Sequence, residues 1–147
     1  MEPFTIPDRP PALPVTKECI YRKIGNINLP SDIFLPRNRN PLHPHPVMVY
    51  IHGGGFIGGD CTDYSRPLFQ RFLSAGFIVI SMGYRLLPET SLDGLLEDVR
   101  YMESWLRNCL PSVITSLTVD RENIIVVGAS AGALLALLTV GAFLVPE

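Results

Sequence analysis

The sequence predicts a domain of the α/β class, with a mostly parallel sheet covered by helices on both faces. After a first pair of short strands, apolar segments typical of buried strands alternate three times with segments of helical periodicity. Hydrophobic residues make up 47% of the chain and charged residues 18%, which indicates a folded core rather than disorder. We expect residues 1–16 to form an extended, proline-rich arm and residues 17–147 to form part of such a domain.

The first two strands are predicted to form a hairpin. Cys19–Ile24 and Ile27–Phe34 are short alternating runs, and the Gly-Asn dipeptide at 25–26 between them is a turn signal. Proline lacks the N–H that an interior strand uses, so Pro30 favours an edge position for the second strand.

The later elements are predicted from apolar runs and helical spacing. Strands buried on both faces are expected over 47–51, 77–82 and 124–127, and helices over 65–75, 91–108 and 131–144. Gly76 and Ser91 are predicted as the caps of the first and second helices. The proline-rich stretch 36–46 is predicted to be a surface loop, in which His43 and His45 are exposed.

A turn of small residues follows the last predicted strand, with the sequence Gly-Ala-Ser-Ala-Gly over 128–132. A serine on a sharp strand-to-helix turn has its oxygen lifted above the sheet, and the strain requires small neighbours. The following helix also directs free N–H groups and its positive dipole end at this position. The pattern favours an activated Ser130 over a turn with no catalytic role.

A second glycine-rich segment, His-Gly-Gly-Gly-Phe over 52–56, comes directly after the strand 47–51. Three glycines allow the backbone to approach a ligand closely, and inward N–H groups can hold the oxyanion that forms when serine attacks a carbonyl. Phosphate-binding loops are also glycine-rich: residues 53–58 match the spacing GxGxxG, whereas GxxxxGK[ST] is absent. Because the small-residue turn around Ser130 follows downstream, we favour an oxyanion loop over a phosphate loop or a flexible turn.

A third segment, Tyr84–Glu89 with the sequence YRLLPE, follows the strand 77–82. By itself it indicates a strand end followed by a turn. Arg85 and Glu89 are expected to form a structural ion pair or a solvated face. Asp93 and Asp98, on the next predicted helix, are expected on the surface or in a cap.

Together, the three segments resemble the hormone-sensitive-lipase-like family of α/β-hydrolases, over roughly residues 17–145. The resemblance implies an α/β-hydrolase fold and a serine esterase or lipase-like activity on small carboxylic esters. It implies that Ser130 is the nucleophile and forms an acyl-enzyme. No metal or organic cofactor is implied. Ala129, Ala133 and Gly83 depart from residues common in the family, but all three are small, so the turn is retained.

The resemblance also implies roles for the backbone around the serine. The N–H groups of Gly54, Gly55 and Ala131 would be the oxyanion donors, with His52 and Gly53 supporting the glycine loop.

The other members of a catalytic triad are missing from their expected places. In this fold an acid and then a histidine follow the serine in chain order. Beyond Ser130 the chain has no His and no Asp, its one carboxylate is Glu147, and all three histidines come earlier. Because loss of a triad base costs orders of magnitude in rate, we expect the chain alone to be nearly or wholly inactive.

This pattern predicts a fragment of a longer enzyme, a truncated gene product, or a chain that needs a partner. The strand 124–127 would then be an apolar sheet edge, open to a partner chain or to self-association. A non-catalytic binding or regulatory module remains an alternative, and so does a membrane-anchored interaction protein through the apolar run 124–145.

Composition excludes several other classes. The net charge of −2 gives no electrostatic case for nucleic acid or an anionic membrane. Three widely spaced cysteines, Cys19, Cys61 and Cys109, suggest neither a disulfide framework nor a zinc site. With no signal peptide visible at the N-terminus, we expect a cytoplasmic protein whose partner is a small-molecule ester.

Overall fold

The computed structural model describes residues 12–144, with side chains described up to residue 140. Most of the predicted N-terminal arm therefore lies outside the described residues. The strands, in chain order, are β1 (Lys17–Ile24), β2 (Ile27–Phe34), β3 (His45–Ile51), β4 (Ile78–Met82) and β5 (Val119–Gly128). The helices are α1 (Arg66–Ser74), α2 (Leu92–Asn108), α3 (Leu110–Val113) and α4 (Ala131–Leu144).

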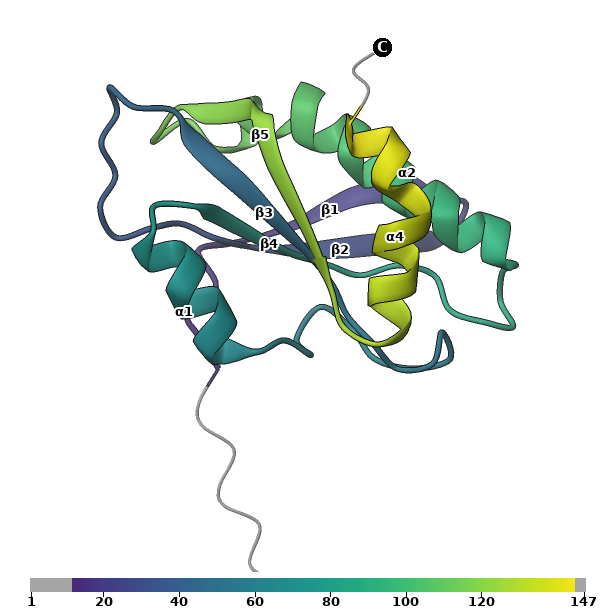
Figure 1. Cartoon of the computed structure of the whole chain (residues 1–147). Coiled ribbons are helices and arrows are strands. Elements are labelled where there is room, and N and C mark those ends of the chain that lie inside the picture. Colours follow the sequence, from purple (N-terminus) through teal and green to yellow (C-terminus); the bar gives the residue numbers. More distant parts are fainter. Residues whose placement is uncertain (1–11, 145–147) are drawn as a thin grey trace, which may run out of the picture.

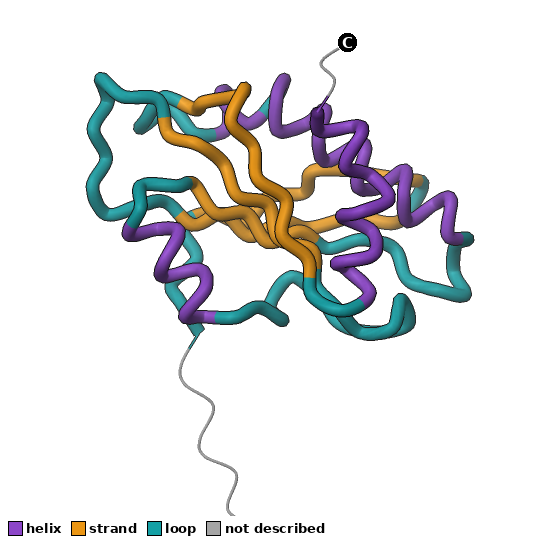
Figure 2. Tube along the Cα trace, viewed as in Figure 1, coloured by secondary structure: helices purple, strands orange, loops and turns teal. Residues whose placement is uncertain are grey.

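The strands form one mixed sheet in the order β1-β2-β4-β3-β5 (Figure 1). β1 and β2 form an antiparallel hairpin, and β2 also runs antiparallel to β4. The other pairings, β4 with β3 and β3 with β5, are parallel. Helices lie on both sides of the sheet, which confirms the predicted α/β class (Figure 2).

The prediction of an edge position for β2 is wrong, because β2 lies between β1 and β4. The hairpin itself is confirmed, with Gly25 at a φ of 54° in its turn. Two local features accommodate Pro30 inside the sheet. The register of β1 shifts between Ile20 and Arg22, opposite Pro30. Pairing with β4 is kept on the other side, where the Pro30 carbonyl accepts from the Gly83 N–H at 2.9 Å.

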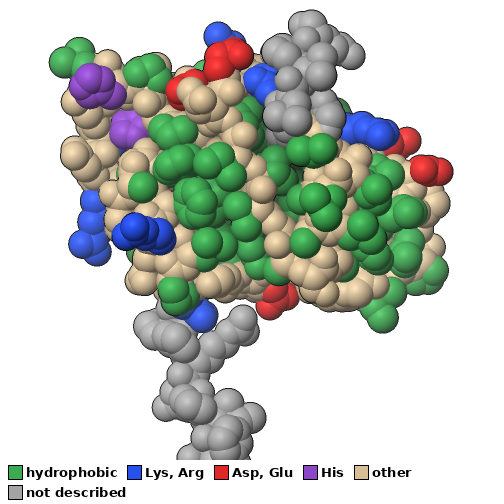
Figure 3. Space-filling model, viewed as in Figure 1, with side chains coloured by type: hydrophobic (Ala, Val, Ile, Leu, Met, Phe, Trp, Pro, Cys, Tyr) green, Lys and Arg blue, Asp and Glu red, His purple; other side chains and the backbone are tan. Residues whose placement is uncertain are grey.

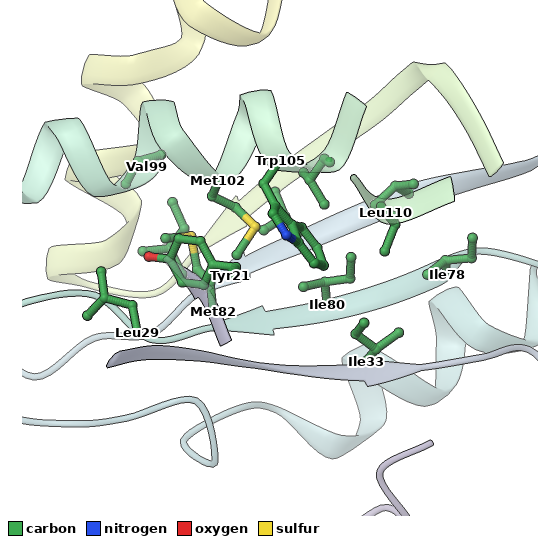
Figure 4. Packing of buried hydrophobic residues seen from close by; sticks show 14 of the residues in the cluster. Tyr21, Leu29, Ile33, Ile78, Ile80, Met82, Val99, Met102, Trp105 and Leu110 are labelled. Atoms are coloured by element: carbon green, nitrogen blue, oxygen red, sulfur yellow. The ribbon is translucent and has the colours of Figure 1, made fainter. Parts of the chain in front are cut away.

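Two apolar cores pack against the two faces of the sheet. On one face, residues of α2 and α3 such as Val99, Met102, Trp105 and Leu110 meet strand residues such as Ile80 (Figure 4). On the other face a smaller, aromatic-rich cluster joins α1 to the sheet: Phe34, Met48, Tyr50, Phe69 and Val79. Every residue of β3 from 47 to 51 is buried, which places this strand in the centre of both cores.

His45 is buried, contrary to the prediction that it is solvent-exposed; His43 is exposed, as predicted. The chain enters the sheet earlier than its apolar run suggests, because the His45 N–H donates to the Thr118 carbonyl at 2.8 Å. The imidazole Nδ1 lies 2.8 Å from the Gly76 carbonyl oxygen, and Nε2 lies 3.3 Å from that of Asn40. The ring therefore joins the loop before β3 to the turn after α1.

β5 and α4 are only partly covered. The composition of the segment 124–127 predicts a strand buried on both faces, which is wrong for Ile125, 40% exposed. The prediction of an apolar sheet edge at this segment is confirmed, because β5 is an edge strand. On α4, Ala131, Leu135 and Thr139 face the protein at a spacing of one helical turn. No helix within residues 12–144 is long and apolar enough to cross a membrane, since the apolar run 124–145 is divided between a strand and a helix.

The two faces of α4 should differ sharply in their contribution to stability. Leu135 is fully buried, so we expect Leu135→Ala to lower the free energy of unfolding by about 2–5 kcal/mol. Leu137 is 71% exposed, so Leu137→Ala should change it by less than about 0.5 kcal/mol. Urea unfolding of the two variants checks this. Equal losses in the free energy of unfolding would show that α4 does not direct Leu135 to the core and Leu137 to the surface.

Candidate active site

Ser130 occupies a strained turn between β5 and α4. Its φ of 50° lies in the left-handed region, which residues with a side chain adopt at a cost of roughly 1–3 kcal/mol. β5 ends at Gly128 and α4 begins at Ala131, so the turn has only two residues between the elements. The Ser130 side chain is exposed at the carboxyl end of the parallel strands, the end of α/β sheets at which ligands bind.

The glycines of the turn are required by close backbone contacts. A Cβ at Gly132 would lie 2.2 Å from the carbonyl oxygen of Ile51 and 2.4 Å from that of His52. A Cβ at Gly128 would lie 2.3 Å from the Gly132 carbonyl oxygen. In addition, the Ala129 N–H donates to the Ile51 carbonyl at 3.1 Å. The start of α4 is thus packed directly onto the end of β3, where the second glycine-rich segment begins.

The glycine loop lies against the serine. A Cβ at Gly53 would be 3.2 Å from the Ser130 Cβ and 3.0 Å from the Ala129 carbonyl oxygen. Gly54 and Gly55 have φ values of 117° and 63°, and Phe56 continues the left-handed run at 67°. These conformations fold the loop back on itself, so that the Gly54 carbonyl accepts from the N–H groups of Ile57 and Gly58 at 3.1 Å each.

The N–H groups of Gly54, Gly55 and Ala131 make no hydrogen bond within the described residues, and the same holds for those of Gly53, Phe56 and Ser130 in the same two segments. Ala131 is the first residue of α4, so its N–H has no acceptor inside the helix. The structure thus brings together the backbone segments that contain all the sequence-predicted donors. These free N–H groups lie in segments beside the Ser130 hydroxyl, and such donors can stabilise an oxygen that gains negative charge during a reaction.

The buried side chain of His52 supports the glycine loop. Its ring is almost completely buried and stacks on Tyr84, with ring centroids 4.3 Å apart. Nδ1 lies 2.6 Å from the Gly53 carbonyl oxygen, which fixes Nδ1 as the donor. Burial lowers the pKa of His52 below its ordinary 6.5, against the smaller opposing effect of that hydrogen bond. A neutral, buried ring does not contact the Ser130 hydroxyl as a base would.

The YRLLPE segment braces the glycine loop, a role that its sequence did not reveal. The Tyr84 hydroxyl donates to the His52 carbonyl at 2.8 Å, and the Leu87 N–H donates to the Phe56 carbonyl at 2.7 Å. Burial raises the pKa of Tyr84 to about 12, so the hydroxyl keeps its proton. Both ends of the glycine loop are therefore tied to this segment.

Asp98 holds the YRLLPE segment in place and is fully buried, so its predicted surface or capping role is wrong. Its carboxylate accepts from the backbone N–H of Arg85 at 3.0 Å and from the guanidinium of the same residue. A second guanidinium, that of Arg22 on β1, also pairs with it. The α2 periodicity contained the missed signal, because position 98 falls on the same stripe as the buried Leu95 and Met102.

Within the described residues no histidine or carboxylate hydrogen-bonds to the Ser130 hydroxyl. Nor do the residues from 12 to 144 contain a cluster of side chains that could hold a metal ion. A cavity of about 1070 Å³ lies at the opposite end of β3, between the loop before that strand and the end of α1, and Ser130 does not line it.

Comparison with known families and structures points to esterases. A family model described as BD-FAE matches residues 31–142. Among solved structures, the chain is similar to the esterase Est2 of the Planctomycetes species Thermogutta terrifontis, with 26% identity and a TM-score of 0.73. That match covers 86% of this chain and 44% of the esterase. The butyrate-bound form gives a TM-score of 0.74, with 88% and 46% coverage.

Curated relatives by sequence are much larger proteins. The chain is 38% identical over 122 residues to the non-reducing polyketide synthase adrD of Penicillium rubens, covering 80% of this chain and 5% of the synthase. It is 32% identical over 123 residues to the non-reducing polyketide synthase ascC of Acremonium egyptiacum, covering 82% and 6%. The chain thus spans only about one twentieth of the length of these relatives.

The contact between the two turns should make Gly132 sensitive to any side chain. We expect Gly132→Ala to lower the free energy of unfolding by several kcal/mol, about 3 or more, because the new Cβ would overlap two backbone carbonyls that cannot rotate away. Gly25→Ala is the control, since it has open space and only a strained φ, at a cost of about 1 kcal/mol. Equal losses in thermal or urea unfolding would contradict the packing described here.

The buried neutral state of His52 predicts a pH dependence of stability. Since its pKa is lowered on folding, the unfolded chain binds more protons below pH 6.5, and the His52 contribution is complete above that pH and lost below it. Between a pH above 6.5 and a pH about one unit below it, the free energy of unfolding of the wild type should fall more steeply than that of His52→Gln. The matched control, exposed His43→Gln, should keep the wild-type slope.

Proposed function

Because the chain belongs to the BD-FAE family, an esterase-like family with the α/β-hydrolase fold predicted from the sequence, we propose that it provides the nucleophile and oxyanion hole of a serine acyl-transfer enzyme. In this proposal Ser130 is the nucleophile. The backbone N–H groups of Gly54, Gly55 and Ala131 are the oxyanion donors, and His52 and Gly53 hold the glycine loop in place.

The observation that carries the proposal is the contact between the strained serine turn and the glycine loop. Ser130 is exposed, and the position of a Gly53 Cβ lies 3.2 Å from the Ser130 Cβ. A carbonyl attacked by this hydroxyl would develop its negative charge beside the free N–H groups of the loop and of the first turn of α4. A structural turn alone would not need a left-handed serine next to a left-handed loop.

The reaction requires a base. The hydroxyl attacks an acyl carbonyl and its proton must leave; the tetrahedral intermediate then collapses with loss of the alcohol or thiol, and water hydrolyses the acyl-enzyme. His52 is held neutral under the loop with Nδ1 at a carbonyl oxygen, so we assign it no proton transfer. The base therefore comes from outside the described residues, and the chain by itself is at most a very slow esterase.

The proposed substrates are carboxylic esters or thioesters. Serine, base and backbone donors suffice for their cleavage, so the proposal includes no cofactor. The relatives by sequence are polyketide synthases, which supports a polyketide acyl group as the one transferred. The alternative of a non-catalytic binding module shares the fold, but it makes no use of a free oxyanion hole beside an exposed serine.

An external base should reveal the nucleophile in the chain itself. We expect p-nitrophenyl acetate with added imidazole to acetylate Ser130 roughly 10²-fold faster than Ser74, an exposed serine outside the turn, because a single oxyanion-hole donor is worth about 10²–10³ in rate. Mass spectrometry of the digested protein measures acetylation at both serines. Without imidazole, turnover should match that of Ser130→Ala.

Two results would contradict parts of this proposal, the first the role of Ser130 and the second the absence of a base. Equal acetylation of the two serines would favour the non-catalytic module. Rapid Ser130-dependent turnover without imidazole would mean that a base is already present. Gly54→Ala tests the donors separately: its Cβ would lie 2.1 Å from the Gly58 carbonyl oxygen, so the loop must shift and acetylation of Ser130 should fall.

A further inference from the structure

We propose that the cavity at the end of the sheet opposite Ser130 binds a small amphipathic anion, with a carboxylate or phosphate group at Arg37 and Arg39 and an aliphatic or aromatic body inside. Histidine and basic side chains are visible in Figure 3 on the side where the loop before β3 and α1 lie in Figure 1. The site goes beyond the proposed function and does not depend on it. We call it the arginine cavity and define it by six of its lining residues: Leu13, Phe34, Arg37, Arg39, His43 and Leu73.

Hydrogen bonds hold the walls of the arginine cavity in place. On one side, the Leu35 N–H donates to the Thr16 hydroxyl at 3.1 Å, and the Thr16 N–H donates to the Ile33 carbonyl at 2.9 Å. The segment before β1 is thereby tied to the end of β2. On the other side, the His45 ring joins the loop before β3 to the Gly76 carbonyl, just after α1, with Nδ1 and the oxygen 2.8 Å apart. The cavity is therefore formed before a ligand arrives, as small-molecule sites usually are.

Two arginines at the cavity have no carboxylate partner. Arg37 and Arg39 are exposed and make no ion pair within the described residues. The Arg39 Nε donates to the Pro36 carbonyl at 3.1 Å, which leaves the terminal N–H groups of its guanidinium for a ligand. His43 adds an imidazole, and no Asp or Glu among the described residues lines the cavity. The local charge is positive although the net charge of the chain is −2, which favours a single anionic group over a polyanion.

The lining of the cavity also includes apolar side chains. Phe34 is only 1% exposed, and Leu13 and Leu73 line the cavity beside it. The volume of about 1070 Å³ lies near the top of the range of roughly 300–1,000 Å³ that holds drug-sized ligands. A bare inorganic anion would leave the apolar wall in water, whereas an apolar body would cover it. An amphipathic acid therefore fits both parts of the lining.

Two simple amphiphiles test the proposal. Octyl phosphate and octanoate are titrated, below their critical micelle concentrations, into the ¹⁵N-labelled 147-residue chain, and the amide shifts give both affinity and location. We expect shifts within residues 35–43 and 73–76, and the tighter ligand identifies the head group. Octan-1-ol and inorganic phosphate each carry one half of the ligand, so both should bind at least roughly 10-fold more weakly than octyl phosphate.

Removal of the two charges should weaken binding without unfolding the chain. Arg37→Gln/Arg39→Gln should lower the affinity for the tighter amphiphile by roughly 10-fold or more, because charge-assisted contacts are lost. Its melting temperature should stay that of the wild type, since both arginines are exposed. Arg71→Gln is the matched control: Arg71 is an exposed arginine of α1 that does not line the cavity, and this variant should bind as the wild type does.

The outcomes separate the arginine cavity from the other surfaces of the chain. Shifts at the cavity that the double variant reduces and Arg71→Gln preserves support the proposal. Shifts confined to the glycine loop or to α4 overturn it, and so does equal binding by the wild type and the double variant. The absence of shifts with either amphiphile at millimolar concentration also overturns it. Inorganic phosphate that binds as tightly as octyl phosphate contradicts the amphipathic nature of the ligand.

Discussion

The contact on which the rest of this structure depends is the close packing of two backbone turns at the carboxyl ends of β3 and β5. Gly132 has no room for a Cβ, because the Ile51 and His52 carbonyls occupy that space. This approach keeps Ser130 in its left-handed conformation and holds the glycine loop against it. A side chain at either turn would separate Ser130 from the glycine loop, so the same small residues serve both folding and the proposed chemistry.

Pre-organisation of the loop comes from farther away. The Tyr84 hydroxyl and the Leu87 N–H hold its two ends by donating to backbone carbonyls, and the buried carboxylate of Asp98 holds Arg85 between them. Asp98 is itself neutralised by guanidinium groups from two different parts of the sheet layer, Arg22 and Arg85. Donors that are fixed before the substrate arrives need no reorganisation when charge develops, which is the property that makes an oxyanion hole effective.

The sequence predicted what local patterns determine. The hairpin, the alternation of strands and helices, and the glycine-rich turns all follow from residues close together in the chain. The errors involve partners distant in sequence. Pro30 lies inside the sheet because an irregularity in β1 accommodates it, and His45 is buried by its contact with Gly76, which is 31 residues away in sequence. The spacing of α2 indicated that Asp98 faces the core, but the arginine partners that make its burial possible are distant in sequence. The edge position of β5 was among the predictions, although its composition is that of a buried strand.

The central claim is that the donors of Gly54, Gly55 and Ala131 are in place around Ser130. Amide NMR of the ¹⁵N-labelled chain, after a fluorophosphonate has formed an adduct on the Ser130 hydroxyl, tests it most directly. The phosphoryl oxygen of that adduct imitates the oxyanion, so our account predicts downfield shifts of these three amide protons and little change at Gly25 or Gly76. An adduct on Ser130 that leaves the three amides unshifted would contradict it.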